Sequence, residues 1–299
     1  MLSKELMREV RRLQVRTNRR VDNLFAGEYK SAFKGQGVEF AEVREYEPGD
    51  DIRSIDWNVS ARTGSTFIKR YIEERQLTVI IAVDLSASES FGARGKFKSR
   101  LAVEIGAALC LAATRSNDLA GLQVFTDRVE SFVPPRNGRG HALRIMRDLL
   151  EFEPIGLGTD LPLAIDFLNR ALGRHAVVFL ISDFQAPAHG ENGYARPLRR
   201  LASRHEVVAV RTEDPTEREL PDVGLIRVRD PETGREAMLD TSSRSVRIRA
   251  RAEALRADKE LEQTLRLAKA DLVRVSTDRP FVRDLEACFR MRERRRRWA

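Results

Sequence analysis

Two unbroken apolar runs, residues 78–83 and 176–182, are the strongest pattern along this chain. Both are short and rich in Val and Ile, and neither contains a charged residue. Such runs are typical of parallel strands that are buried on both faces of a sheet. An aspartate follows each run directly, Asp84 after the first and Asp183 after the second. Because ligands bind at the carboxyl ends of strands in open α/β sheets, both aspartates are candidate site residues.

Helical and extended patterns alternate from residue 77 onward. The spacing of apolar residues predicts helices at about residues 98–115, 141–151, 196–204 and 245–269, with one more after Thr159 and a last one around Phe281, Leu285 and Phe289. Strands are predicted at residues 119–125, 129–133, 206–210 and 272–275, and residues 225–228 with 237–239 form a hairpin. This alternation predicts an α/β fold, in which a doubly wound, mostly parallel sheet is covered by helices on both faces.

The first 76 residues differ from this pattern. A helix is predicted at about residues 3–20, and residues 35–76 are rich in glycine, charge and aromatic side chains. Short extended segments occur there at residues 38–40 and 66–68. We therefore expect two parts. Residues 1–76 form an N-terminal helix and a small β-rich unit, and residues 77–299 form the α/β domain, with a hairpin insertion and a basic C-terminal tail.

Composition indicates a soluble globular protein. The chain has 299 residues, of which 42% are hydrophobic and 33% are charged. No apolar run is long enough to span a bilayer, and the charged N-terminus lacks the apolar core of a signal peptide. The two cysteines, Cys110 and Cys288, lack metal-ligand spacing, which indicates buried thiols in a reducing compartment. We therefore expect a cytoplasmic protein, while peripheral contact with a membrane stays open.

The net charge of +8 is concentrated near the two ends of the chain. The arginines there are Arg8, Arg11, Arg12, Arg16, Arg19 and Arg20, and at the other end Arg292 and Arg294 to Arg297. Runs of this kind are usually solvated helix faces or tails, and binding to nucleic acid or anionic lipid is the alternative. Aromatic residues are not interleaved with these arginines, so stacking on single-stranded nucleic acid is disfavoured.

The segment after the first apolar run carries candidate metal chemistry. Asp84, Ser86 and Ser88 stand at alternate positions and offer one carboxylate and two hydroxyl oxygens. Three hard oxygen donors on one turn suit Mg²⁺ or Mn²⁺ better than zinc or copper. Thr159 and Asp183 could complete the set, at a site that we expect to be accessible at the rim of the sheet. The alternative is that the two serines only cap the turn and the helix that follows.

The order of these residues resembles the metal-ion-dependent adhesion site of von Willebrand factor A domains. The matching positions are Asp84, Ser86, Ser88, Thr159 and Asp183. The resemblance implies a Rossmann-type fold of the von Willebrand factor A kind that binds one Mg²⁺ or Mn²⁺ through these residues. Only Asp84 is then expected to touch the ion as an anion, so the ion keeps excess positive charge and open coordination positions.

A second set of motifs lies in the N-terminal part of the chain. It consists of Gly37-Val38-Glu39-Phe40, Arg44-Glu45-Tyr46, Pro48-Gly49-Asp50-Asp51-Ile52-Arg53, Asp56-Trp57 and Ala61-Arg62. Together with the Asp84 motif, these segments resemble the bacterial "domain of unknown function 58" family over nearly the whole chain. Its members contain a von Willebrand A-like domain and are commonly encoded beside MoxR-type AAA+ ATPases. The resemblance therefore implies a partner or adaptor of such an ATPase in protein assembly or maturation, and it supplies no reaction.

The sequence lacks a recognisable catalytic motif. A phosphatase of the haloacid dehalogenase type needs an acid two residues after its nucleophilic aspartate, where this chain has Ser86. Residues 92–96 lack the glycine spacing of a P-loop, and the four histidines are scattered. We therefore expect a protein-interaction module in which an acidic side chain of the partner completes the coordination of the ion. A Mg²⁺-dependent hydrolase that uses Asp84 and Asp183 is the alternative.

Overall fold

The computed structural model describes residues 23–33, 42–47, 50, 52, 55, 57–70, 76–90, 97–186, 189–190, 193–230 and 234–297. The predicted helix at about residues 3–20 and the predicted extended segment at residues 38–40 lie outside these described residues. The chain divides into two compact units. One is formed by residues 34–76, and the other by residues 1–33 together with 77–299.

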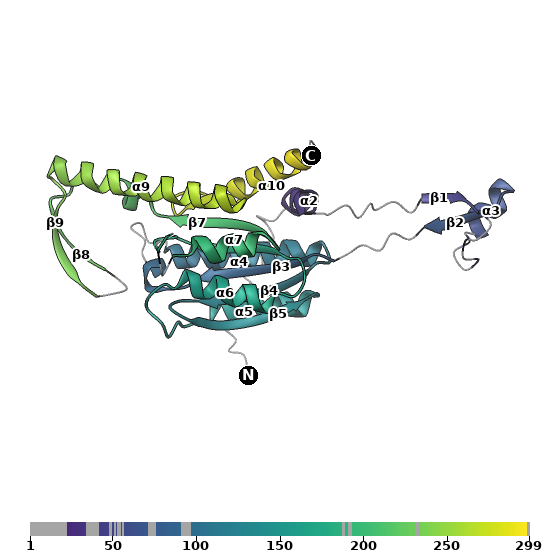
Figure 1. The fold of residues 1–299 in the computed structure, drawn as a ribbon, viewed down its shortest axis with the longest axis horizontal. Coiled ribbons are helices and arrows are strands. Elements are labelled where there is room, and N and C mark those ends of the chain that lie inside the picture. Colours follow the sequence, from purple (N-terminus) through teal and green to yellow (C-terminus); the bar gives the residue numbers. More distant parts are fainter. Residues whose placement is uncertain are drawn as a thin grey trace. The chain divides into compact units, whose positions relative to one another are not determined.

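The larger unit is built around a sheet with six strands in the described part of the chain. These strands are β3 (Thr78–Asp84), β4 (Leu119–Phe125), β5 (Val129–Arg136), β6 (Val177–Ser182), β7 (Glu206–Glu213) and β10 (Asp271–Ser276). Their order across the sheet is β10-β7-β6-β3-β4-β5, and each neighbouring pair is parallel except β4 and β5. Figure 1 labels β3, β4, β5 and β7 of this sheet. The prediction of a mostly parallel α/β sheet is confirmed.

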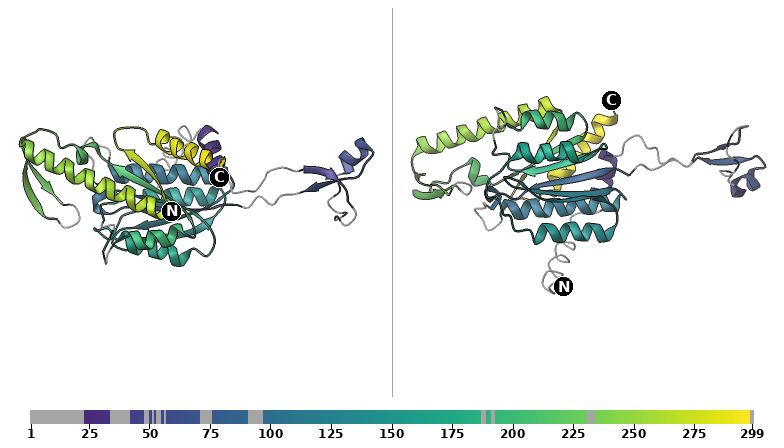
Figure 2. Two further views of the ribbon diagram at one scale, coloured as in Figure 1. Left: turned by 45° about the horizontal axis from the view of Figure 1, so that its top comes forward. Right: turned by 60° about the horizontal axis from the view of Figure 1, so that its bottom comes forward.

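Helices cover both faces of this sheet (Figure 2). One face carries α2 (Asn23–Phe33), α4 (Lys98–Arg115), α5 (Arg139–Leu150) and α10 (Val282–Arg297), and the other carries α6 (Leu161–Ala171), α7 (Ala195–Ala202) and α9 (Arg244–Ala268). In β3, Ile81 and Val83 belong to the first apolar cluster, whereas Ile80 and Ala82 belong to the second. Because side chains alternate along a strand, helices on both faces require the unbroken apolar run seen in the sequence.

The helix α2 packs within the larger unit, although the sequence grouped all residues before 77 together. Tyr29 and Phe33 are buried, and the ring of Phe33 meets that of Phe289 on α10 edge to face, with centroids 5.4 Å apart. The Tyr29 hydroxyl donates a hydrogen bond of 3.3 Å to Oδ2 of Asp118. The aromatic positions of α2 therefore complete the apolar layer of the sheet, and the helix is grouped with residues 77–299 rather than with residues 34–76.

The smaller unit contains a two-stranded antiparallel sheet and a helix in its described part. These elements are β1 (Glu42–Glu45), α3 (Trp57–Thr63) and β2 (Phe67–Arg70). Ser60 on α3 holds the start of β2, since its hydroxyl accepts a hydrogen bond of 2.8 Å from the Phe67 amide. Arg44 pairs with Asp50 at 2.7 Å and links β1 to the segment that follows it within the same unit.

Two short connections after β7 complete the larger unit. The helix α8 (Pro215–Arg218) starts at a capping box formed by Asp214 and Glu217. A helix of four residues shows no periodicity, which explains why the sequence pattern did not predict it. The predicted hairpin is present as β8 (Leu225–Arg229) and β9 (Glu236–Asp240). Thr241 closes the base of this hairpin, because its hydroxyl donates a hydrogen bond of 2.7 Å to the carbonyl of Gly224.

Two of the arginines near the C-terminus, Arg292 and Arg295, lie on α10 and form ion pairs within the protein. Arg292 pairs with Glu206 and Asp271, and its guanidinium carbon lies 4.6 Å from the centre of the Phe33 ring. Arg295 also pairs with Asp271, at 2.7 Å. The arginines near the N-terminus, from Arg8 to Arg20, lie outside the described residues. These two C-terminal arginines therefore help to attach α10 to the sheet.

Both cysteines are buried free thiols, as predicted. Burial raises the pKa of Cys110 and of Cys288 to about 12. Each thiol is therefore protonated at neutral pH and packs as a small apolar group. In the part of the chain that the structure describes, no helix combines the length and apolar character needed to cross a bilayer.

Candidate metal centre

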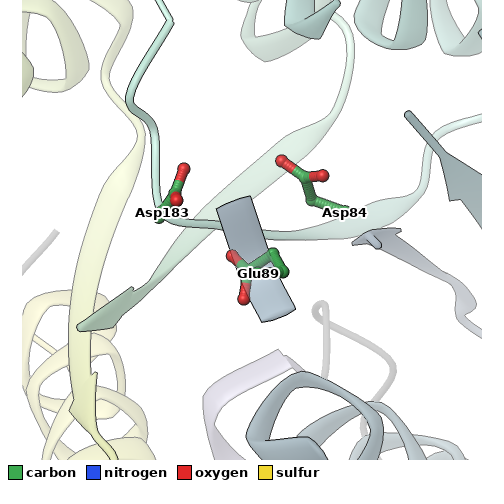
Figure 3. Close-up of side chains that lie close together, drawn as sticks. All are labelled: Asp84, Glu89 and Asp183. Carbon is green, nitrogen blue, oxygen red and sulfur yellow. The ribbon is translucent and has the colours of Figure 1, made fainter. Parts of the chain in front are cut away.

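The pairing of β3 with β6 brings the two aspartates predicted from the sequence to the same edge of the sheet. Val83 lies opposite Ile181 in the parallel register, so Asp84 and Asp183 follow at neighbouring positions. Glu89 joins them from the 3₁₀ helix η2 (Ala87–Ser90). One carboxylate oxygen from each of these three residues lies within 4.8 Å of the other two (Figure 3). The sheet edge therefore gathers three carboxylates.

The turn after β3 is organised around Asp84. Its Oδ1 accepts a hydrogen bond of 3.0 Å from the Ser86 amide, and its Oδ2 accepts one of 2.7 Å from the Ser182 hydroxyl. The hydroxyl oxygens of Ser86 and Ser88 lie 3.1 Å apart. The two predicted serine ligands therefore lie beside each other on the turn that begins at Asp84.

Glu89 is a candidate ligand that the sequence analysis missed. Its Oε1 accepts a hydrogen bond of 2.6 Å from the Thr212 hydroxyl on β7. Its Oε2 is buried and has no hydrogen-bond partner among the described residues. Burial, followed by the nearby carboxylate of Asp183, raises the pKa of Glu89 well above its usual value. The sequence could have indicated Glu89 as a candidate ligand, because this charged residue comes directly after a serine-rich turn at the end of a buried strand.

Lys98, the first residue of α4, was also missed. Its side chain is fully buried, and its Nζ lies 2.8 Å from Oδ2 of Asp183 and 2.7 Å from Oε1 of Glu217. Burial lowers the pKa of Lys98, but the surrounding carboxylates outweigh that effect and raise the pKa above its usual value. The signal in the sequence was a lysine three and seven residues before Leu101 and Ile105, on the apolar stripe of α4.

Thr159 lies in the loop before α6, and two backbone hydrogen bonds fix this loop near the serine turn. The Ala87 amide donates to the carbonyl of Leu157 at 2.9 Å, and the Asp160 amide donates to the carbonyl of Thr126 at 2.9 Å. Thr159 itself is half-buried. The loop is thus attached to η2, while Thr159 as a metal ligand stays a prediction.

The expectation that these groups are accessible at the rim of the sheet is wrong. Asp84 and Ser86 are fully buried, and Asp183 and Ser88 are nearly so. Burial, and then the carboxylate of Asp183, raise the pKa of Asp84 to about 7. Loss of hydration is the larger cause of this rise in pKa, and the second is that the ionised forms of Asp84 and Asp183 disfavour each other.

The donor set fits a hard divalent cation. Carboxylate oxygens from Asp84, Glu89 and Asp183 and hydroxyl oxygens from Ser86 and Ser88 are the ligand types that Mg²⁺ and Mn²⁺ take. The unpartnered Oε2 of Glu89 is an oxygen that such an ion would satisfy. These residues would hold the ion, and no sulfur or imidazole ligand belongs to the cluster described here.

A mostly parallel sheet covered by helices, with carboxylates gathered at the carboxyl ends of its central strands, places this chain in the α/β class of proteins. Residues 42–260 match the family described as "Protein of unknown function DUF58". The chain belongs to this family, which confirms the resemblance drawn from its motifs. It is 35% identical over 285 residues to the uncharacterized protein Rv1480 of Mycobacterium tuberculosis, a match that covers 94% of this chain and 88% of the relative.

Solved structures with a related arrangement include two bacterial proteins. The conserved hypothetical protein BatB from Bacteroides thetaiotaomicron matches with a TM-score of 0.48 and 18% identity, over 73% of this chain and 99% of that one. The von Willebrand factor type A protein from Catenulispora acidiphila matches with a TM-score of 0.44 and 10% identity, over 77% of this chain and 43% of that one.

Proposed function

We propose that this protein is an interaction module whose binding to a partner depends on a divalent cation held at the end of β3. The convergence of Asp84, Glu89 and Asp183 carries the proposal, because Lys98 balances only part of the charge of these buried carboxylates, and one oxygen of Glu89 has no hydrogen-bond partner among the described residues. The ion is Mg²⁺ or Mn²⁺, and Ser86 and Ser88 supply neutral oxygens beside the carboxylates. Thr159 extends this set from the neighbouring loop.

Glu89 changes the charge expected around the ion. Asp84, Glu89, Asp183 and Glu217 carry four negative charges when ionised, and Lys98, which pairs with Asp183 and Glu217, carries one positive charge, which leaves a net charge of −3. A divalent ion balances most of that charge without help from another protein. We therefore expect the chain to retain the ion by itself, so that an oxygen from the partner completes the coordination rather than supplying the missing charge.

The partner in this proposal is a MoxR-type AAA+ ATPase, or a protein remodelled by one, that presents an acidic side chain. The support for this partner is that the chain belongs to the family, because the resemblance to that family implied an ATPase partner. The protein then acts as an adaptor in the assembly or maturation of other proteins. Contact through the C-terminal arginines is less favoured, since Arg292 and Arg295 already pair with acids of the same chain.

A pull-down with the MoxR-type ATPase encoded in the same genome tests this proposal. Binding should occur with Mg²⁺ and be lost with EDTA or in the Ser86→Ala/Ser88→Ala variant. Arg294→Glu, a charge reversal on the exposed end of α10, is the control and should bind like the wild type. Equal binding with and without metal would remove the metal-bridged mechanism, and no binding under either condition would remove this partner.

A Mg²⁺-dependent hydrolase is the second candidate, and one observation favours it. Asp84 and Asp183 converge with Glu89 at the end of β3, and paired carboxylates of this kind are the ligands by which a Mg²⁺-dependent hydrolase holds its ion. The test is to incubate the purified protein with generic phosphoesters and Mg²⁺, with Asp84→Asn as the control. Hydrolysis by the wild type that is absent from Asp84→Asn would establish this candidate, and no turnover by the wild type would dismiss it for this class of substrate.

A further inference from the structure

The side chain of Lys98 connects the carboxylate cluster to a different part of the fold. Its ammonium is shared between Asp183, which follows β6, and Glu217, which lies in α8. These residues are 85 and 119 positions from Lys98 in the sequence. The lysine is fully buried, and a buried charge of this kind is retained only where carboxylates compensate it.

Each oxygen of Asp183 accepts one of the hydrogen bonds in the described part of the chain. Oδ2 accepts from Lys98 at 2.8 Å, and Oδ1 accepts from the Gln185 amide at 3.1 Å. A divalent ion at the cluster would need an oxygen of the same carboxylate, and it would repel the ammonium beside it. The ion and Lys98 therefore compete for Asp183.

We propose that Lys98 is the resident cation of the metal-free site, and that a bound divalent ion drives its ammonium away from Asp183 and onto Glu217. The inference rests on the metal site of the proposed function and adds the residue that sets its affinity. Glu217 is suited to receive the ammonium because Lys98 already lies 2.7 Å from its Oε1. A quarter of the Glu217 side chain is exposed, so solvent can adjust around it as the charge moves.

Glu217 also holds the start of α8 in place. Its Oε2 accepts a hydrogen bond of 3.1 Å from the Asp214 amide and closes the capping box, and its Oε1 accepts from the Gln185 side chain at 3.3 Å. The next residue, Arg218, pairs with Asp258 of α9 at 2.9 Å. A change in the contact between Lys98 and Glu217 therefore acts on the helix that connects the metal site to α9.

A surface groove lies at this junction of α8 and α9. It is lined by Arg218, Glu219, Arg251, Ala254, Leu255 and Asp258. Leu255 is half-exposed there, and Arg218 is held by the ion pair with Asp258. The proposal therefore places the response to the metal at residues 214–219, which border this groove.

Titration with Mn²⁺ tests the competition directly. Calorimetry would compare the wild type with Lys98→Met, in which the competing ammonium is removed and the length of the side chain is kept. The expected result is that Lys98→Met binds Mn²⁺ at least about tenfold more tightly, because one like charge has left the site. Circular dichroism would establish that the variant is folded.

A second variant keeps the test decisive if Lys98→Met does not fold. Glu217→Gln removes the negative charge that would hold the displaced ammonium, so it should bind Mn²⁺ roughly threefold to tenfold more weakly than the wild type. Glu253→Gln, which changes an exposed acid on α9, is the control and should leave the affinity unchanged. Hydrogen exchange of the amides of residues 214–219 should respond to Mn²⁺ in the wild type.

The outcomes separate this inference from the proposed function. If the wild type binds Mn²⁺ but neither Lys98→Met nor Glu217→Gln changes the affinity in the stated direction, the role of Lys98 is overturned while the metal site stands. If only Lys98→Met binds Mn²⁺, Lys98 is the competitor and the metal-dependent function is overturned. If Mn²⁺ binds to none of these proteins, both are overturned.

Discussion

The hydroxyl of Ser182 donates a hydrogen bond of 2.7 Å to Oδ2 of Asp84, across 98 positions of sequence. It joins the last residues of two adjacent parallel strands, β3 and β6. The same hydroxyl oxygen accepts a hydrogen bond of 3.1 Å from the Phe184 amide. Ser182 thus fixes the orientation of the Asp84 carboxylate and shapes the turn that carries Asp183, although it is not itself among the predicted metal ligands.

Replacing Ser182 by Ala should destabilise the protein by about 1–3 kcal/mol, because a buried carboxylate oxygen and a buried amide both lose their partner. Urea unfolding at neutral pH measures this change in the free energy of unfolding. Ser245→Ala, on the exposed face of α9, is the control and should stay within about 0.5 kcal/mol of the wild type. Equal stability of the two variants would show that the Ser182 hydroxyl does not support Asp84.

The stability of the metal-free protein should fall as the pH rises from about 4 to about 7. Burial and Asp183 raise the pKa of Asp84 to about 7, whereas an unfolded aspartate titrates near 3.9. In this window the folded protein keeps a proton that the unfolded chain has released, so each increase in pH favours unfolding.

Asp84→Asn should remove this dependence. The amide keeps an acceptor for the Ser86 amide, and Ser182 can accept instead of donate. In EDTA at pH 8, the variant should be more stable than the wild type by on the order of 2 kcal/mol, and the difference should shrink at pH 5. Thermal unfolding at the two pH values measures this difference in stability. Added Mg²⁺ should stabilise only the wild type. A variant that is less stable than the wild type at pH 8 would contradict the raised pKa.

The carboxylate of Glu130 clamps the loop that leads to Thr159. Its Oε1 accepts hydrogen bonds from the Thr126 hydroxyl at 2.8 Å, the Ile155 amide at 3.1 Å and the Gly156 amide at 2.7 Å. Glu130→Ala should therefore lower the affinity for Mg²⁺ about threefold or more, since the loop loses its anchor. Glu130→Gln keeps one acceptor oxygen and should recover part of that loss. Calorimetric titration measures the Mg²⁺ affinity of both variants, and Glu153→Ala, at an exposed position, is the control. An unchanged affinity in Glu130→Ala would show that this loop does not contribute to the metal site.

His205 should make the protein less stable in mild acid. Its ring is buried, neither nitrogen has a hydrogen-bond partner in the described part of the chain, and burial lowers its pKa. Below about pH 6.5 the unfolded chain gains a proton that the folded protein does not, so stability is lost as the pH falls. His205→Phe should therefore stabilise the protein more at pH 5.5 than at pH 8, as judged by urea unfolding. His189→Phe, an exposed position, should show no such difference.

The sequence by itself determined the sheet and the position of two aspartates at its edge. A strand that is buried on two faces needs apolar side chains at every position, so it can be recognised in the sequence as an unbroken apolar run. For this reason β3, β6 and the aspartates that follow their apolar runs could be predicted. The amphipathic spacing of α4 and the turn signals around β8 and β9 gave their positions for the same reason, because local periodicity and turn chemistry act over a few residues.

The tertiary structure alone decided the charges around the site. Glu89, Lys98 and Glu217 come from three separate elements, and their contacts join residues more than 80 positions apart. No local pattern encodes such a contact, since a carboxylate on a turn or a lysine at the start of a helix is ordinarily solvated. Here Glu89 and Lys98 are both fully buried, so water is excluded from the carboxylate and from the ammonium. That exclusion of water turned a site expected to have one anion at an open rim into a buried cluster with its own counter-ion.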